Sequence, residues 1–252
     1  MADKETRTTV DGLRAVEMYY RPIKEIASGS TAFYQSQTRL NAPDIGVLMP
    51  ETFRDVCEMS SQAIKLFQLE FIQLLSACTA FTEREINYGW ASVYMPVRFL
   101  KEKRAPKIVT DVCLKREVPT SKVCFELSEV LLAETDGQIA ANIVTMRNLG
   151  FHFMLTGFGG NNCPMMRLSN FAVDYVMFSP EVANYIGKDE RSDNAVKSII
   201  SFVNDIGSEP VTDGVSNSHQ AETVYGFECS YCAGTLSGKY VAEKEIKGKN
   251  ED

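Results

Sequence analysis

The 252-residue sequence has no run of 18 consecutive apolar residues, and its basic residues are outnumbered by its acidic ones. Without such a run, no segment is expected to cross a bilayer. Lys and Arg total 26 against 33 Asp and Glu, a net charge of −7 that argues against a nucleic-acid-binding surface. The first seven residues are polar and lack the apolar segment of a secretory signal. We therefore predict a cytoplasmic protein with no membrane or nucleic-acid partner.

The chain also lacks the residue patterns of a zinc or redox centre. It has only two histidines, and its seven cysteines are odd in number and mostly fall within apolar patterns. This predicts reduced thiols that fill the core. Cys229 and Cys232 form a lone C-x-x-C without a second ligand pair, which favours structural thiols over zinc. His152 in an apolar strand and His219 at a polar helix start are expected to be structural.

With 44% hydrophobic residues, the chain can bury a large core. No Gly/Ser linker or repeat divides it, so one domain over residues 15–240 is expected. Residues 1–14 are weakly patterned and predict a flexible lead-in, and the mixed charges of residues 241–252 predict a solvated tail.

Strand and helix patterns alternate through the domain. Strands are predicted at 16–23, 31–35, 90–95, 122–127, 151–155, 174–178, 210–212 and 226–229. Helices are predicted from Pro50 to about Ala80 and at 108–114, 139–146 and 196–206. This alternation over the whole chain predicts a (β/α)8-type barrel, in which functional groups lie at the carboxyl ends of the strands.

Several short motifs occur in a characteristic order between Tyr19 and Gly238. Residues 20–23 are YRPI, 33–40 FYQSQTRL, 125–129 FELSE, 156–159 TGFG, 174–179 DYVMFS, 212–216 TDGVS and 232–234 CAG. In this order they resemble the YQPI, GYEALLRW, EITE, DDFG, DYIKID, AEGVE and VQG motifs of the EAL domain, the cyclic-di-GMP phosphodiesterase family. The resemblance implies a TIM-like barrel of EAL type, in which the opening hairpin makes one strand antiparallel to the rest.

The resemblance also implies that most catalytic positions of that family are replaced. Gln35 stands for the glutamate that names the family, Tyr94 for a ligand asparagine, Thr156 and Gly157 for two metal-binding aspartates, Met177 for a water-positioning lysine, Ser216 for a glutamate and Ala233 for a glutamine. A neutral amide is a poor ligand for a hard cation, and a thioether supplies neither charge nor a donor. We predict no bound metal, no cofactor and no hydrolysis of cyclic-di-GMP.

Four residues remain candidates for ligand binding. Arg39 falls at the family's phosphate-contacting arginine, and Arg21 replaces a glutamine beside a guanine. Glu126, Glu129 and Asp213 are the retained acidic positions, Asp213 as a shortened glutamate, and Glu126 and Asp213 are the two candidates among them. Glu126 and Glu129 also fit a structural network. The alternative for Arg39 is a surface arginine or an ion pair at the barrel rim.

Three functions follow from these observations. The first is a sensor that binds cyclic-di-GMP without hydrolysing it, and the second is a signalling module that acts through a protein partner. The third is an active or retooled phosphodiesterase that uses Glu126 and Asp213. A homodimer is compatible with each of them. The basic run at residues 101–107 is expected to be a solvated loop or a contact for an acidic partner.

Overall fold

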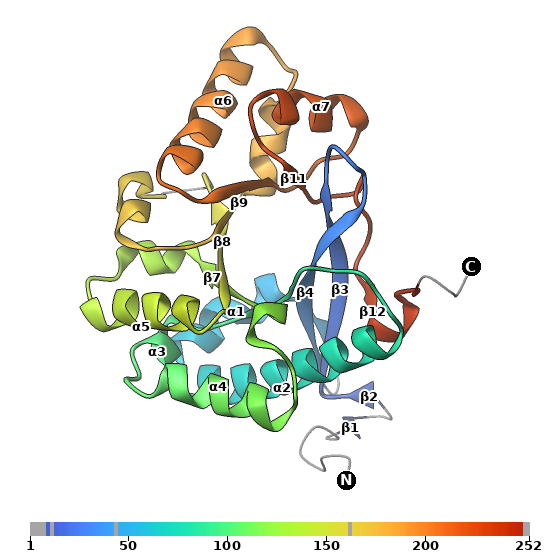
Figure 1. The fold of residues 1–252 in the computed structure, drawn as a ribbon, viewed down its shortest axis with the longest axis vertical. Coiled ribbons are helices and arrows are strands. Elements are labelled where there is room, and N and C mark those ends of the chain that lie inside the picture. Colours follow the sequence, from blue (N-terminus) through green and yellow to red (C-terminus); the bar gives the residue numbers. More distant parts are fainter. Residues whose placement is uncertain (1–8, 11–12, 43–44, 161–162, 249–252) are drawn as a thin grey trace.

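The computed structural model describes residues 9–10, 13–42, 45–160 and 163–248, and its centre is a closed barrel of strands surrounded by helices (Figure 1). The barrel strands are β3 (Val16–Glu25), β4 (Thr31–Ala42), β6 (Ala91–Tyr94), β7 (Val123–Ser128), β8 (His152–Phe158), β9 (Tyr175–Phe178), β10 (Glu209–Thr212) and β11 (Tyr231–Cys232). β3 pairs antiparallel with both β4 and β11, while the remaining neighbours run parallel. The predicted barrel with one antiparallel strand is confirmed.

The helices lie outside the barrel and return the chain to the amino ends of the strands. They are α1 (Pro50–Met59), α2 (Gln62–Glu83), α3 (Val97–Leu100), α4 (Ala105–Lys115), α5 (Gly137–Asn148), α6 (Glu190–Asp205) and α7 (Ser218–Gly226). Short 3-10 turns are η2 (Thr120–Lys122), η3 (Glu129–Ala133), η4 (Met165–Asn170), η5 (Pro180–Tyr185) and η6 (Glu243–Glu245). Side chains of Asp136, Asp189 and Asn217 cap the starts of α5, α6 and α7 by accepting backbone N–H groups.

α2 is the one described helix that is long and apolar enough to span a bilayer, with a window of mean hydropathy 1.3. It packs on the barrel instead, and Leu74, Leu75 and Phe81 on its inner side are fully buried. This burial is typical of a core helix in a barrel.

Aromatic side chains close the amino end of the barrel. Phe33 and Trp90 stack with ring centroids 4.1 Å apart, and the rings of Tyr175 and Tyr231 pack edgewise or tilted against Phe33. Trp90 directly precedes β6, Tyr175 and Tyr231 are the first residues of β9 and β11, and Phe33 is the third residue of β4. Because this end is filled, the open end is formed by the carboxyl ends of the parallel strands.

Two predicted elements differ from the structure. The helix expected from Pro50 to Ala80 is two helices, because the chain turns at Ser60 and Ser61. The strand expected at 226–229 is wrong: this stretch ends α7 in a turn with Glu228 at φ 69, and the strand starts at Tyr231. The apolar Phe227 and Cys229 pack the helix end against the core, which gave the segment its strand-like pattern.

Both ends of the chain contain paired backbone. β1 (Thr9–Val10) pairs with β2 (Leu13–Arg14), whereas the rest of the predicted lead-in lies outside the described residues. Between these ends, the short internal strand β5 (Gly46–Leu48) pairs with β4 at the sheet edge. β12 (Val241–Ala242) pairs with β3, and Ile246 beyond it is buried, so this part of the predicted tail is held against the barrel. Residues 249–252 lie outside the described part, and the domain boundaries stay predictions.

Candidate functional site at the barrel mouth

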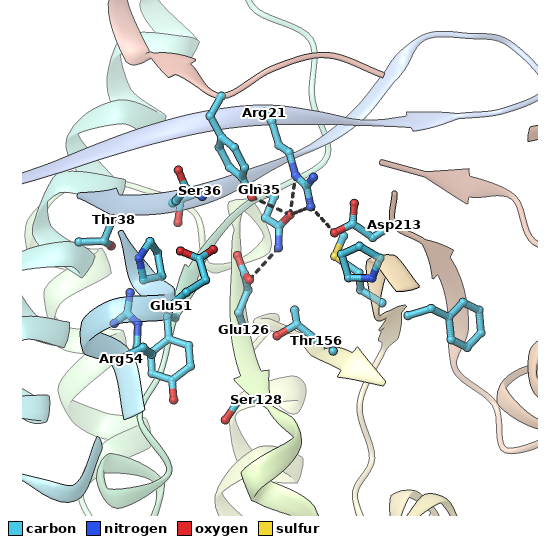
Figure 2. Close-up of a pocket in the computed structure, with 18 residues that line it drawn as sticks. Arg21, Gln35, Ser36, Thr38, Glu51, Arg54, Glu126, Ser128, Thr156 and Asp213 are labelled. Atoms are coloured by element: carbon cyan, nitrogen blue, oxygen red, sulfur yellow. Dashed lines mark hydrogen bonds and ion pairs between the residues drawn. The ribbon is translucent and has the colours of Figure 1, made fainter. Parts of the chain in front are cut away.

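A cavity of about 290 Å³ opens at the carboxyl ends of the barrel strands (Figure 2). It brings together eight of the positions singled out in the sequence: Arg21, Gln35, Tyr94, Glu126, Thr156, Gly157, Met177 and Asp213. They come from β3, β4, β6, β7, β8, β9 and the loop after β10. The motif positions therefore converge on one place although they are spread over most of the chain.

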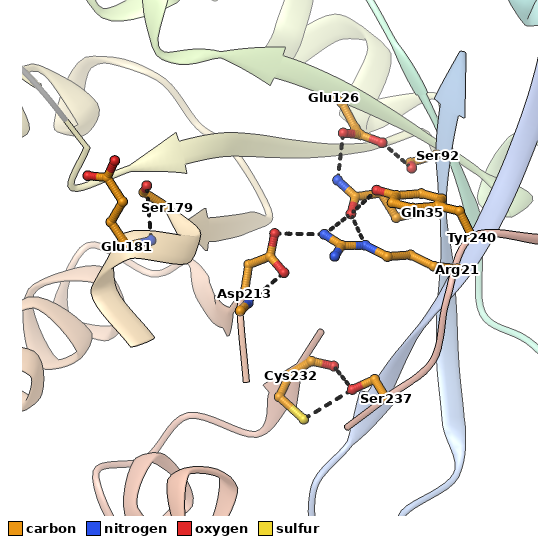
Figure 3. A network of polar contacts seen from close by, with 11 residues as sticks. Arg21, Gln35, Ser92, Glu126, Ser179, Glu181, Asp213, Cys232, Ser237 and Tyr240 are labelled. Atoms are coloured by element: carbon orange, nitrogen blue, oxygen red, sulfur yellow. Dashed lines mark hydrogen bonds and ion pairs between the residues drawn. The ribbon is translucent and has the colours of Figure 1, made fainter. Parts of the chain in front are cut away.

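A continuous polar network crosses this cavity (Figure 3). Arg21 donates from Nε and Nη2 to Gln35 Oε1 at 2.9 and 2.6 Å, and its Nη2 also pairs with Asp213 Oδ2 at 2.7 Å. Gln35 Nε2 donates to Glu126 Oε2 at 2.9 Å. Ser92 Oγ donates to the other oxygen of Glu126. The guanidinium and the amide thus link Glu126 to Asp213.

Tyr240 completes the network from the chain segment after β11. Its hydroxyl donates to Gln35 Oε1 at 3.1 Å, and the Arg21 guanidinium lies 4.9 Å from the centre of its ring. Sequence reasoning missed Tyr240 because it falls in no motif and borders the stretch expected to be a tail. Its partner Gln35 is 205 residues away along the chain.

Burial sets the protonation of this network. Burial raises the pKa of Glu126, and the hydrogen bonds from Ser92 and Gln35 and the charge of Arg21 lower it only in part. Burial lowers the pKa of Arg21, but the interactions with Tyr240 and Asp213 together raise it by more, so the pKa lies above its ordinary value. Arg21 therefore remains a cation fixed between Gln35 and Asp213.

A second arginine lines the cavity from α1, on the opposite side from Arg21 (Figure 2). Arg54 pairs with the fully buried Glu70 of α2 through two contacts of 2.9 and 3.3 Å, and Thr38 Oγ1 donates to the same carboxylate at 2.6 Å. The guanidinium also lies 4.2 Å from the ring centre of Tyr94. Sequence analysis missed Arg54, because the apolar spacing that predicted these helices gives no signal for a pair between them.

Three predicted positions do not line the cavity. Arg39 lies over the ring of Tyr19, with its guanidinium carbon 3.6 Å from the ring centre. Ser216 donates to Gln220 next to α7, and Ala233 is buried in the barrel interior. Gln37, on the same strand as Arg39, does line the cavity and presents a buried Oε1 with no hydrogen-bond partner among the described residues. The mouth thus offers an unpaired acceptor beside two fixed cations.

The carboxylates of Glu51, Glu126 and Asp213 line the cavity. Within the described ranges, no three His, Cys, Asp or Glu side chains gather as a candidate metal cluster. Glu126 and Asp213 each already contact donors of this chain.

The fold and the mouth define a (β/α)8 barrel with one antiparallel strand and a polar site at its carboxyl end. The EAL domain model matches residues 7–240, and the chain belongs to this family. It is 23% identical over 230 residues to the cyclic di-GMP phosphodiesterase RocR of Pseudomonas aeruginosa, matching 91% of this chain and 58% of that protein. The chain thus spans little more than half the length of this curated relative.

Solved structures support the fold. The EAL enzyme Bd1971 with cAMP and cyclic-di-GMP bound superposes with a TM-score of 0.80 at 18% identity, covering 91% of this chain and 63% of that chain. The PaMucR phosphodiesterase in complex with c-di-GMP gives a TM-score of 0.79 at 14% identity, covering 92% and 94%. At this level of identity, the likeness shows the shared barrel alone.

Proposed function

We propose that this chain is an EAL-domain signalling module that binds cyclic-di-GMP at the barrel mouth without hydrolysing it, or that signals through contact with a protein partner. The observation that carries the proposal is the guanidinium of Arg21 between Gln35 and Asp213. This cation contacts Asp213 where the family resemblance implies a metal site. A cytoplasmic location and a homodimer stay predictions.

The residues of the mouth do not fit the divalent metal that the family implies. Hard cations such as Mg²⁺ need several oxygen ligands, usually carboxylates. Here β8 offers Thr156 and Gly157 in place of two aspartates, and Gln35 directs its amide nitrogen at Glu126. Asp213 is neutralised by Arg21. The network is therefore satisfied without a metal, and no hydrolytic step is assigned to it.

The same geometry suits an anionic ligand with planar rings. Arg21 and Arg54 place two guanidinium groups on opposite sides of the cavity, and guanidinium favours phosphate oxygens. The rings of Tyr94 and Tyr240 line the same cavity, each with a guanidinium against one face, and the proposed ligand stacks a base against the other face. Each arginine is already held by a buried carboxylate, so its orientation is fixed before a ligand enters.

Two measurements test this proposal. Calorimetric titration with cyclic-di-GMP in EDTA should show saturable binding that added Mg²⁺ does not strengthen. Incubation with Mg²⁺ or Mn²⁺ should leave the dinucleotide intact by chromatography. An absence of binding moves the function to the protein-partner form.

A retooled or active metal-dependent phosphodiesterase is the second candidate, since Glu126 and Asp213 still line the cavity. Formation of the linear dinucleotide by wild-type protein, lost in Glu126→Gln, would establish it and overturn the first proposal.

A further inference from the structure

An apolar groove lies on the outside of the barrel, between α2 and α4. Its volume is about 420 Å³, and the two helices run side by side at the lower edge of Figure 1. Phe67, Phe71 and Phe99 are buried along it, and the partly exposed Leu69, Ile72, Ile108 and Val112 form its walls. The groove is separate from the mouth, with no lining residue in common.

The walls of the groove are two ridges with helical spacing. Lys65, Leu69 and Ile72 follow at i, i+4 and i+7 on α2, and Arg104, Ile108 and Val112 follow at i, i+4 and i+8 at the start of and along α4. Residues at this spacing share one face of a helix, so each ridge presents a basic residue followed by apolar ones. Two such ridges form a surface complementary to a third helix.

Two apolar side chains of α2 that line the groove, Leu69 and Ile72, are only partly buried. Ile108 on the facing ridge is 40% exposed. A contiguous apolar surface with charged residues at its edge is typical of a protein-binding site.

The segment that carries α4 is opposite in charge to the whole chain. Residues 101–116 contain six basic residues (Lys101, Lys103, Arg104, Lys107, Lys115, Arg116) and two acidic ones (Glu102, Asp111), a net charge of +4 in a chain of −7. Lys65, Lys103 and Arg104 are exposed and have no ion-pair partner within the part of the chain that the structure describes. Lys65 and Arg104 also lie at the amino ends of their helices, where the helix dipole adds positive potential.

We propose that this groove binds an acidic amphipathic helix of a protein partner, with apolar side chains against Leu69, Ile72 and Ile108 and carboxylates beside Lys65 and Arg104. A second copy of the chain fits less well, because two equivalent basic surfaces would face each other. A bilayer also fits less well, because the apolar residues line a recess between two helices. The inference does not depend on nucleotide binding at the mouth.

The test uses a fluorescein-labelled peptide of about 14 residues, roughly four helical turns, with Leu at helical spacing and Glu elsewhere. Its twin carries Lys in place of Glu. Fluorescence anisotropy should show saturable binding of the Glu peptide, weakened by added salt, and no binding of the Lys peptide. Ile108→Glu and Arg104→Glu should each weaken binding about tenfold or more, as for a central contact of an interface.

A matched control keeps this result specific. Val144 on α5 is 47% exposed, a fraction similar to the 40% of Ile108, and it does not line the groove. Val144→Glu should therefore leave binding unchanged. Circular dichroism melting curves establish that the variants are folded. We expect Ile108→Glu to fold, because the side chain of Ile108 is exposed.

Four outcomes overturn the proposal. The first is no saturation up to about 1 mM peptide, and the second is equal binding of both peptides or of the Ile108→Glu variant. The third is a concentration-dependent dimer that Ile108→Glu dissociates, which assigns the groove to a second copy. The fourth is co-sedimentation with phosphatidylglycerol vesicles that Ile108→Glu abolishes, which assigns it to a membrane.

Discussion

Gln35 connects Arg21 to Glu126 through the two ends of its amide. Its oxygen accepts from Arg21 and Tyr240, while its nitrogen donates to Glu126 Oε2 at 2.9 Å. A glutamate at this position would place a second carboxylate against Glu126, and together with Asp213 three carboxylates would then share the single guanidinium of Arg21. The neutral amide avoids this excess of negative charge.

Gln35→Glu should therefore convert the mouth into a site that responds to divalent cations. Without metal, the variant should lose about 2 kcal/mol or more of unfolding free energy, because a buried hydrogen bond is replaced by repulsion. Mn²⁺ should raise its melting temperature and leave that of the wild type unchanged. Gln68→Glu on the exposed side of α2 is the control. Equal responses to Mn²⁺ in Gln35→Glu and the wild type would contradict this account of the amide.

Substitution of Arg54 and substitution of Arg39 should have different effects on ligand binding at the mouth. Arg54 lines the cavity, whereas Arg39 is stacked on Tyr19 outside its lining. If cyclic-di-GMP binds there, Arg54→Ala should weaken binding about tenfold or more, since a charge-assisted contact to phosphate is lost. Arg39→Ala should change it little. Calorimetric titration of both variants measures the difference, and a larger loss in Arg39→Ala would assign the phosphate contact to Arg39 instead.

At the scale of single elements, much of the barrel was predictable from sequence, and its exceptions have physical causes. The apolar strands and the helical stripe before Gly207 are local patterns, so they predicted β7, β8 and β9 and the second half of α6, whose polar first turns carry no such stripe. The Gln35–Tyr240 and Arg54–Glu70 contacts join different elements and arise only when the barrel closes. Position along the strand explains why Arg39 lies outside the cavity lining. It is four residues beyond Gln35, about 13 Å further along β4.

The loop between β11 and β12 depends on one close backbone approach. A Cβ on Gly234 would lie 2.4 Å from the carbonyl oxygen and 2.5 Å from the nitrogen of Val215, and its φ of +133 disfavours other residues. Gly234→Ala should therefore destabilise the fold by more than 1 kcal/mol. Gly29 has a φ of +69 with nothing within 4 Å, so Gly29→Ala carries the backbone cost alone. Urea unfolding compares them, and equal losses would rule out the steric effect.

The cysteines are distributed over the whole molecule, and their reactivity reports on solvent access to the core. All seven thiols are free: Cys78, Cys113, Cys124, Cys229 and Cys232 are buried, and Cys57 and Cys163 are half-buried. This agrees with the reduced, core-filling thiols expected from the sequence. Burial raises the pKa of Cys78 and Cys229 to about 11 and that of Cys113 to about 12. Because the thiolate is the reactive form, these thiols are both shielded and protonated at neutral pH.

Ellman's reagent at about pH 8, near the ordinary thiol pKa, should therefore modify native protein at two sites and unfolded protein at seven. Cys57→Ser and Cys163→Ser should each remove one of the fast reactions, because their thiols alone reach solvent in part. Raising the pH towards 11 should not by itself make the five buried thiols react fast, since deprotonation does not expose a buried sulfur. Their reaction rate should be limited by local opening of the barrel. Fast reaction of a third thiol in native protein would show that the barrel opens locally around that cysteine.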